Sequence, residues 1–328
     1  RAMFEHSNTA AYPRPAKLFS HNDQQSTWQA FEPEGSVTGW GGRLGDLAMS
    51  ANTNAMFTTI NATGNAVFLS GDRVVPFKVA QNGATVMYPV QSGNLYGSRA
   101  AGDALSQLLG THHSHVFEQD YSHMNLRSIE YNGFINDALK NSSLNTSFND
   151  NNSLAKQLEI VARLISARGT LGVARQVFMV SLGGFDHHTG LLGSHGTLLG
   201  QLDEALGAFQ SAMVELDVSD RVTAFTASDF GRTLATNGDG SDHGWGGHHF
   251  IVGGAVNGGR FFGQAPHISI SSDDQVGRGR LLPTTSVDQY VSTLALWLGV
   301  SPSDLPSIAP NIGRFSGADL GFMRAPSD

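Results

Sequence analysis

The stretch that decides the fold is residues 222–254, VTAFTASDFGRTLATNGDGSDHGWGGHHFIVGG. It begins with an apolar run, residues 222–227, and ends with a second apolar run, residues 250–252. The glycine-rich segment between them carries the candidate site residues Asp229, Asp242, His243, His248 and His249. This pattern is typical of metal and catalytic sites in open α/β sheets, where polar residues lie on the loops that follow the carboxyl ends of buried strands. The stretch therefore predicts an α/β fold with a site at the strand ends.

An earlier segment repeats this arrangement. The run Val177-Phe-Met-Val-Ser-Leu-Gly-Gly is followed by Asp186, His187 and His188. His195 lies seven residues beyond His188, so that on a helix the two side chains could share a face. Aspartate and histidine are ligands of zinc, manganese and iron at neutral pH. Asp186 is therefore a candidate metal ligand, although it could instead cap the helix that follows.

The pattern between these two segments is strand, helix, strand. Residues 175–182 and 222–227 have strand character, and residues 190–216 have helical character. Such alternation predicts a parallel sheet with helices packed on it. Further helices are expected at 98–140, at 154–167 after an N-cap at Ser153 and at 287–298 after an N-cap at Ser286, with further strands at 249–256 and 260–262.

Residues 55–90 alternate apolar and polar positions between Gly-Asn, Gly-Asp and Asn-Gly turn dipeptides. This pattern predicts a small antiparallel meander inserted into the domain. The expected fold class is therefore α/β, with a mainly parallel central sheet, helices on both faces and this antiparallel insertion. We expect residues 1–328 to form a single domain, because the chain length allows one large domain.

Composition excludes several classes of protein and of site. The formal net charge of −8, with no run of Lys or Arg, argues against a nucleic-acid partner. The chain has no cysteine, so any metal must be bound by His, Asp, Glu or Asn. No apolar stretch approaches the roughly 18–20 residues that a membrane-spanning helix needs.

Other polar residues could join the site. Three histidines and one aspartate within residues 242–249 form the densest cluster, and the neighbouring glycines would let backbone approach an ion or a substrate. Arg232 could clamp an oxyanion or could be an ordinary surface cation. His21 and Asp23 could reach the site from the N-terminal side or could belong to a hydrogen-bonded loop.

Six motifs in this order resemble a bacterial family catalogued as domain of unknown function 1501. They are Phe19-Ser-His-Asn-Asp-Gln-Gln, Gly39-Trp-Gly-Gly-Arg-Leu, Leu182-Gly-Gly-Phe-Asp-His-His, Ser228-Asp-Phe-Gly-Arg-Thr, Ser241-Asp-His-Gly-Trp-Gly-Gly-His-His and Gly279-Arg-Leu-Leu-Pro-Thr-Thr-Ser-Val-Asp-Gln-Tyr. The resemblance implies membership of the alkaline phosphatase and sulfatase superfamily, with a metal site at the strand carboxyl ends. It also implies export by the twin-arginine route, and hence a periplasmic or extracellular location.

The resemblance extends to single residues. Asp186 with His188 resembles the contribution of one segment to a metal site, and Asp229 resembles the aspartate of a strand-end Asp-His-Gly motif, with Phe230 in the place of the histidine. His243 or His249 would supply the late histidine. Related chains begin with a strand that precedes the first motif present here, so we expect this domain to lack that first strand.

The function expected on these grounds is an exported, metal-dependent hydrolase of phosphate or sulfate esters. One or two divalent ions (zinc, manganese or iron) would act on a small anionic ester. The expected metal ligands are Asp186, His188, Asp229, Asp242, His243 and His249, and the expected catalytic residues are Arg232, His21 and Asp23. Two alternatives stay open: a non-enzymatic secreted binding or assembly protein with a degraded site, and a metal enzyme of another reaction class. A homo-oligomer is also possible.

Overall fold

A mostly parallel sheet with the strand order β3-β2-β1-β4 runs through the middle of the protein. The structure is a computed structural model and describes residues 10–11, 13–33, 35–64, 66–84 and 87–324. β1 (Thr59–Asn61) pairs in parallel with both β2 (Phe77–Ala80) and β4 (Val177–Met179), whereas β3 (Gly83–Ala84) pairs antiparallel with β2. Every residue of β1 is buried, as expected for a strand that is covered on both faces. The α/β class with a mainly parallel sheet is confirmed.

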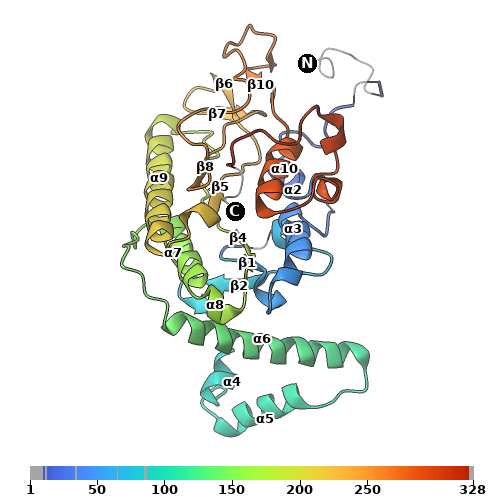
Figure 1. Ribbon diagram of the computed structural model, residues 1–328, viewed down its shortest axis with the longest axis vertical. Coiled ribbons are helices and arrows are strands. Elements are labelled where there is room, and N and C mark those ends of the chain that lie inside the picture. The colour runs from blue at the N-terminus through green and yellow to red at the C-terminus, as the bar shows by residue number, and fades with distance from the viewer. Residues whose placement is uncertain (1–9, 12, 34, 65, 85–86, 325–328) are drawn as a thin grey trace.

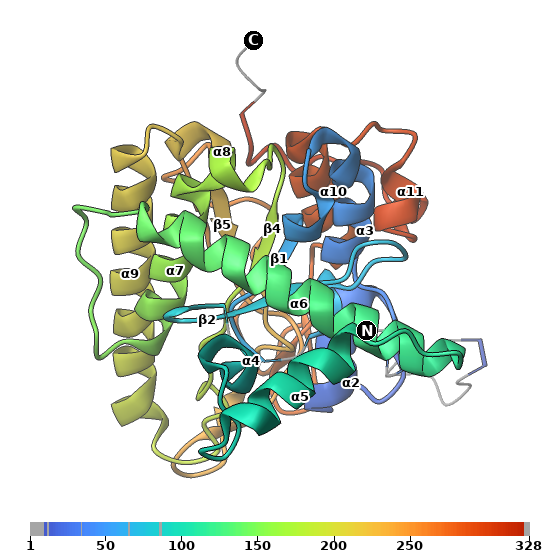
Figure 2. The same cartoon turned by 90° about the horizontal axis from the view of Figure 1, so that it is seen from below.

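Helices cover both faces of this sheet. Along β4, Val177 and Met179 pack in one apolar cluster and Phe178 packs in the other, because successive side chains of a strand point to opposite faces. The cluster around Phe178 contains residues of α6 (Val116–Lys140), α7 (Ser153–Ser166) and α9 (Leu191–Glu215). The opposite cluster contains residues of α3 (Trp40–Ala48), α10 (Val287–Leu298) and α11 (Leu305–Ile308), and the two helical layers are visible in Figures 1 and 2.

Several elements lie where the periodicity predicts them. β4, α9 and α10 fall within the expected ranges, and α10 begins with a capping box between Ser286 and Gln289. α7 begins one residue earlier than predicted, and its N-cap is Asn152, whose side chain accepts hydrogen bonds from the Leu154 and Ala155 amides. The other helices are α2 (His21–Ala30), α4 (Tyr88–Ser92), α5 (Arg99–Gly110) and α8 (Arg168–Leu171), with 3-10 turns at Met49–Ala51, Ala55–Phe57, Val67–Leu69, Ser219–Arg221 and Ile312–Arg314.

The strand after α9 corrects the predicted parallel strand pair. β5 (Thr223–Phe225) pairs antiparallel with β8 (Ile251–Gly253). The chain reverses direction between them through the hairpin of β6 (Arg232–Thr236) and β7 (Ser241–His243), so β8 returns alongside β5. Residues 260–262 form no strand, and a short antiparallel pair, β9 (Gln275–Val276) and β10 (Arg280–Leu281), follows instead.

Residues 55–90 also differ from the prediction, because they do not form a separate meander. They supply β1 and β2, which are parallel neighbours in the main sheet, and only the β2–β3 pair is antiparallel. The segment between β1 and β2 crosses over α3 instead of turning directly, which makes the two strands parallel. Thr85 and Val86, in the last of the alternating runs, lie outside the described residues.

The crossover is fixed to α3 by a glycine and an aspartate. A Cβ at Gly42 would lie 2.0 Å from the carbonyl carbon of Ser70, so only glycine allows this backbone approach. One turn later, the Asp46 carboxylate accepts hydrogen bonds from the amides of Asp72, Arg73 and Val74 at 2.7, 3.0 and 2.8 Å. These contacts set where the chain enters β2. Within the described residues, no helix is long and apolar enough to cross a membrane.

We predict that Gly42→Ala destabilises the protein by about 1–3 kcal/mol, because the added methyl group would overpack against backbone that cannot move aside. The control is Gly133→Ala in α6, where nothing lies within 4 Å of the position that the methyl group would take and alanine is the better helix former. Urea unfolding of both variants measures the difference. Equal free energies of unfolding for the two variants would contradict this account of the crossover.

Candidate functional site

The β6–β7 hairpin brings the first two polar groups of the site together. Arg232 and His243 are direct partners in its antiparallel register, so their side chains emerge on the same face. Arg232 donates hydrogen bonds to Asp186 Oδ1 and to the Ser241 carbonyl oxygen. His243 Nε2 lies 3.1 Å from the same Asp186 oxygen. The hairpin thus presents a guanidinium and an imidazole to one carboxylate.

The segment that follows β4 carries Asp186 and His188 and is held by the hairpin turn. The Ser241 amide donates to the His187 carbonyl at 3.0 Å, and the Asn237 side chain donates to the His188 carbonyl at 3.1 Å. A Cβ at Gly240 would lie 2.4 Å from the His187 carbonyl oxygen. This glycine therefore serves the close approach of two backbone segments, and not the approach of backbone to an ion that the sequence suggested.

The N-terminal end of α2 supplies the third segment. His21 is the first residue of this helix, with Nδ1 2.5 Å from Asp229 Oδ2 and Nε2 3.2 Å from Asp186 Oδ2. Just before it, Phe19 has a φ of 75°, in the left-handed region, and its carbonyl oxygen lies 2.8 Å from His243 Nδ1. The Arg280 guanidinium covers the Phe19 ring at 4.6 Å from its centroid. Backbone strain of this kind is found where surrounding contacts fix a functional geometry.

The hydrogen bonds of the Nδ1 atoms show which ring nitrogen of His21 and of His243 carries a proton. The Phe19 carbonyl and the Asp229 carboxylate can only accept, so the Nδ1 atoms of His243 and His21 must donate to them. His188 Nδ1 likewise faces a carboxylate oxygen of Asp242, at 3.6 Å. When neutral, His21 and His243 therefore have a bare Nε2. The Nε2 atoms of all three histidines lie within 3.2 Å of an Asp186 oxygen.

This arrangement has the chemistry of a cation site. The ligand atoms of His21, Asp186 and His243 lie within 4.8 Å of one another, and no other group of this kind occurs in the part of the chain that the structure describes. His188 Nε2 adds a fourth donor, only 2.9 Å from His243 Nε2. Two bare nitrogens at this distance repel each other unless a proton or a metal ion lies between them. His21 Nε2, moreover, is buried without a hydrogen-bond partner.

The electrostatics favour an ionised carboxylate at the centre. Burial alone would raise the pKa of Asp186, but the neighbouring Arg232 and His21 side chains outweigh it and hold the pKa below the ordinary value. Asp229 behaves alike: burial opposes ionisation, and hydrogen bonds from His21 and Ser228 lower its pKa. Burial disfavours the charged form of His21, yet its contacts with Asp229 and Asp186 raise its pKa overall. Without a metal ion, the two carboxylates therefore favour the protonated form of His21.

The predicted ligands occupy two kinds of position. Inner residues contact one another around the Asp186 carboxylate, and outer residues lie behind a histidine, on the side away from Asp186. Asp186, His188 and His243 converge as expected, and His21, predicted as a catalytic residue, converges with them. Asp229 and Asp242, predicted as ligands, lie behind the imidazoles of His21 and His188. Asp242 also accepts hydrogen bonds from Arg278 at 2.9 Å and from Asn237 at 3.1 Å. Carboxylates in this outer position orient metal-binding histidines.

Three other predicted residues lie elsewhere. His249 packs its ring against Trp28 at 4.7 Å and Tyr290 at 6.0 Å, and faces the Thr226 hydroxyl. Asp23 is buried at the start of α2, where it contacts Lys17 and the Ser20 hydroxyl. His195 stacks edge-on with His187. The helix and strand geometry turns all three side chains away from the His–Asp cluster.

The site also contains two arginines that were not predicted to belong to it, and Phe230. Arg278 and Arg280 join Arg232 around it: Arg278 contacts Asp242, and Arg280 donates to the His243 carbonyl at 3.0 Å. Phe230 lies over the imidazoles of His21 and His243, with ring centroids at 4.7 and 4.5 Å. The motif Gly279-Arg-Leu-Leu was a usable signal for Arg280, whereas nothing marked Arg278, or Phe19 as the source of a carbonyl acceptor.

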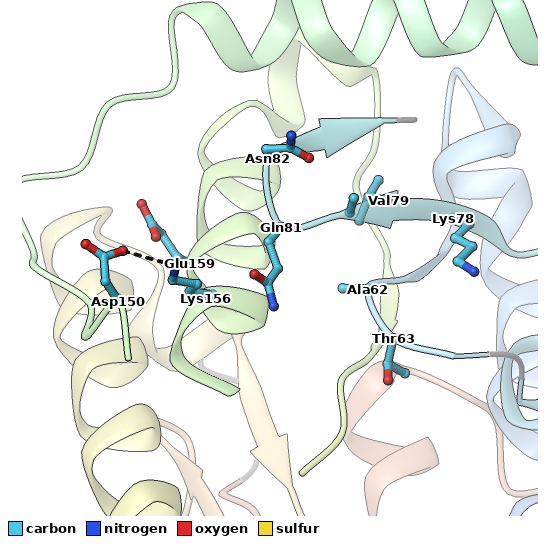
Figure 3. A pocket seen from close by; sticks show the side chains of 10 residues that line it. Ala62, Thr63, Lys78, Val79, Gln81, Asn82, Asp150, Lys156 and Glu159 are labelled. Atoms are coloured by element: carbon cyan, nitrogen blue, oxygen red, sulfur yellow. Dashed lines mark ion pairs between the residues drawn. The ribbon is translucent and has the colours of Figure 1, made fainter. Parts of the chain in front are cut away.

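A separate hollow lies away from this cluster, next to the carboxyl ends of β1 and β2. Its volume is about 630 Å³, and none of the predicted site residues lines it. Figure 3 shows its polar lining, in which Lys156 pairs with Asp150 at 3.6 Å and Lys78 lies on the opposite side. Among the described residues, the hollow has no group of side chains that could hold a metal ion.

Comparison with known proteins agrees with the resemblance in the motifs. The model of the family described as "Protein of unknown function (DUF1501)" matches residues 115–304, more than half of the chain, and the chain belongs to this family. The match includes Asp186, His188, Arg232 and His243, whereas His21 precedes it. No curated protein and no solved structure matches the chain.

The buried position of His249 predicts an acid-sensitive contribution to stability. Burial, with a smaller effect of His248, lowers the pKa of His249 from 6.5 to about 4. In the unfolded chain this imidazole takes up a proton near pH 6.5, so its contribution is fully present above that pH and is lost as the pH falls towards 4. We expect His249→Phe to reduce the loss of stability over this interval, as measured by urea unfolding at both ends of it.

His112→Phe is the matched control, because His112 is exposed in the loop before α6. Its stability should follow the wild-type pH dependence. If His249→Phe also keeps the wild-type pH dependence, His249 is not the acid-sensitive group.

Proposed function

We propose that this member of the DUF1501 family is a metal-dependent hydrolase of phosphate or sulfate esters. The observation that carries the proposal is the convergence of three Nε2 atoms, from His21, His188 and His243, on the Asp186 carboxylate. In each imidazole the other nitrogen faces an oxygen acceptor. This is the arrangement in which proteins present histidines to a metal ion.

The donor set fits a divalent transition metal. Three imidazole nitrogens and one carboxylate oxygen suit zinc, manganese or iron, and the lack of thiolates excludes the sulfur-rich sites. Bound there, such an ion would polarise an ester oxygen and lower the pKa of a water molecule. The negative Asp186 carboxylate would offset part of the positive charge of the ion.

The surrounding residues would keep the site in order. Asp229 holds His21 in the tautomer with a bare Nε2, and the Phe19 carbonyl does the same for His243. Arg232 fixes the orientation of the Asp186 carboxylate through its hydrogen bond and is itself held by Ser241. Each inner group therefore has an outer partner on a different segment, so that little reorganisation is needed when a ligand binds.

Positive charge next to the cluster supports an anionic substrate. Arg232, Arg278 and Arg280 all contact the residues that form the site, and the Arg278 side chain is 52% exposed. Guanidinium groups bind the oxygens of phosphate and sulfate through paired hydrogen bonds. Phe230 covers one side of the imidazoles and would limit access of water from that side. Export from the cytoplasm, implied by the family resemblance, is part of the same proposal.

The first test is the metal content of the protein, purified without chelators. We expect about one or two equivalents of zinc, manganese or iron per chain by elemental mass spectrometry. His243→Ala should reduce the bound metal at least tenfold and should abolish the cleavage of aryl phosphate or aryl sulfate esters, because it removes an inner nitrogen. His112→Ala, at an exposed histidine, should change neither quantity.

Metal-free wild-type protein that also fails to take up metal on dialysis would contradict the proposal and would favour the binding or assembly alternative. Stoichiometric metal without ester cleavage would instead favour a metal enzyme of another reaction class. The two readouts therefore separate the metal site from the reaction assigned to it.

The outer position of Asp229 gives a second prediction. Asp229→Asn keeps the shape of the side chain but removes the negative charge that holds His21 Nδ1–H. We expect a 10–100-fold loss of metal affinity, as is usual when the carboxylate behind a metal-binding histidine is replaced. Competition with a chelating dye measures the affinity. Asp220→Asn, at an exposed aspartate, is the control, and equal affinities for the two variants would remove Asp229 from the site.

A further inference from the structure

The α5–α6 hairpin exposes an unusual amount of apolar surface. It lies at one end of the molecule, and in both views α5 runs alongside α6 there (Figures 1 and 2). Of the large apolar side chains that are exposed in the described residues, 9 of 21 fall between Tyr88 and Phe134. Soluble proteins seldom leave such apolar clusters uncovered unless the surface meets a partner.

The exposed side chains follow the spacing of a helix–helix seam. Phe117, Tyr121 and Met124 are 75%, 62% and 55% exposed, and they follow one another at intervals of four and three residues. This is the spacing of the apolar positions that face a second helix in a coiled coil. α5 does not cover this stripe, because Ser122, the buried residue in this half of α6, lies on another face of the helix.

The charges beside the stripe are arranged for a second copy of the same helix. Asp120 and Arg127 both lie on one flank, one heptad apart, and neither forms an ion pair among the described residues. In an antiparallel pair related by a twofold axis, each flank meets the same flank of the other helix. With Tyr121 of one copy level with Met124 of the other, Asp120 comes within reach of Arg127 twice, once at each end of the contact.

We propose that the protein forms a homodimer through antiparallel packing of α6 against α6 of a second copy. The stripe defined by Phe117, Tyr121 and Met124 forms the apolar seam, and the reciprocal Asp120–Arg127 pairs set its register. A membrane surface fits less well, because surface-bound helices are rich in Lys and Arg, and this half of α6 carries Glu118 and Asp120 against the single Arg127. The inference is independent of the metal site and of the reaction proposed for it.

The test is the oligomeric state of the full chain, measured by analytical ultracentrifugation. The wild type should be a dimer, and Tyr121→Lys should be a monomer, because it places a charge in the seam. Phe261→Lys is the control: Phe261 is 95% exposed but lies far from α6 in the sequence and on no helix, so this variant should remain a dimer. Far-ultraviolet circular dichroism should show that all variants are folded.

Charge exchange tests the register. Asp120→Arg alone and Arg127→Asp alone each replace two attractive contacts with two repulsive ones, so each should raise the dimer dissociation constant by about tenfold. The double variant D120R/R127D should restore the wild-type value. A mixture of the two single variants should form a heterodimer, because all contacts between them are again of opposite charge.

A wild-type protein that stays monomeric up to about 100 μM would overturn the proposal. A dimer that is unaffected by Tyr121→Lys would also overturn it, because the contact would then lie elsewhere. Both single variants could weaken the dimer while the double variant and the mixture fail to restore the wild-type dissociation constant. That result would contradict the antiparallel register. If the protein is a monomer that binds neutral or anionic vesicles, and Tyr121→Lys abolishes this binding, the partner of the stripe is a membrane surface and not a second copy of the protein.

Discussion

The Asp186 carboxylate is the interaction on which the rest of the site depends. One of its oxygens accepts from Arg232 and lies 3.1 Å from the Nε2 atoms of His188 and His243, and the other faces His21 at 3.2 Å. Three segments that are distant in the sequence therefore meet at one ionised group. The arginine and the histidines stabilise its negative charge, and oxygen acceptors face the Nδ1 atoms of the imidazoles, so that their Nε2 atoms point to Asp186.

The fold supports this convergence by fixing backbone against backbone. Gly240 lies against the segment that carries Asp186, and Gly231 lies against the Gly246 carbonyl, where a Cβ would be 2.1 Å away. The hairpin register then sets Arg232 opposite His243. The strained φ of Phe19 aims its carbonyl at His243, and the Arg280 guanidinium over the Phe19 ring holds that conformation. Most of the geometry therefore comes from main-chain contacts, which hold the side chains in place before any ligand binds.

Periodicity and capping predicted the local elements well, because their causes are local. β4, α9 and α10 follow from apolar spacing and from the Ser286 cap. Strand partners could not be predicted in the same way: β5 pairs with β8 and not in a parallel unit, since that choice depends on where the intervening hairpin returns the chain. The apolar runs at 55–90 were consistent with a meander, yet the docking of the crossover on α3 makes β1 and β2 parallel.

The same limit applies to the site. Residue type and position at a strand end identified Asp186, His188 and His243, and the family motif pointed to His21. Which residues are inner and which are outer depends on distances across the fold. Asp229 and Asp242 face the far nitrogens of imidazoles, and His249, one residue from an exposed histidine, turns towards Trp28. No spacing rule within the chain distinguishes these places.

The most direct test of the account is a crystal structure of the protein grown with zinc, with anomalous diffraction recorded on both sides of the zinc absorption edge. We predict an anomalous peak between His21, Asp186 and His243, about 2.0–2.2 Å from the imidazole nitrogens. A peak confined to other histidines, or a His21–Asp186–His243 cluster that stays hydrogen-bonded without metal in the presence of zinc, would contradict it.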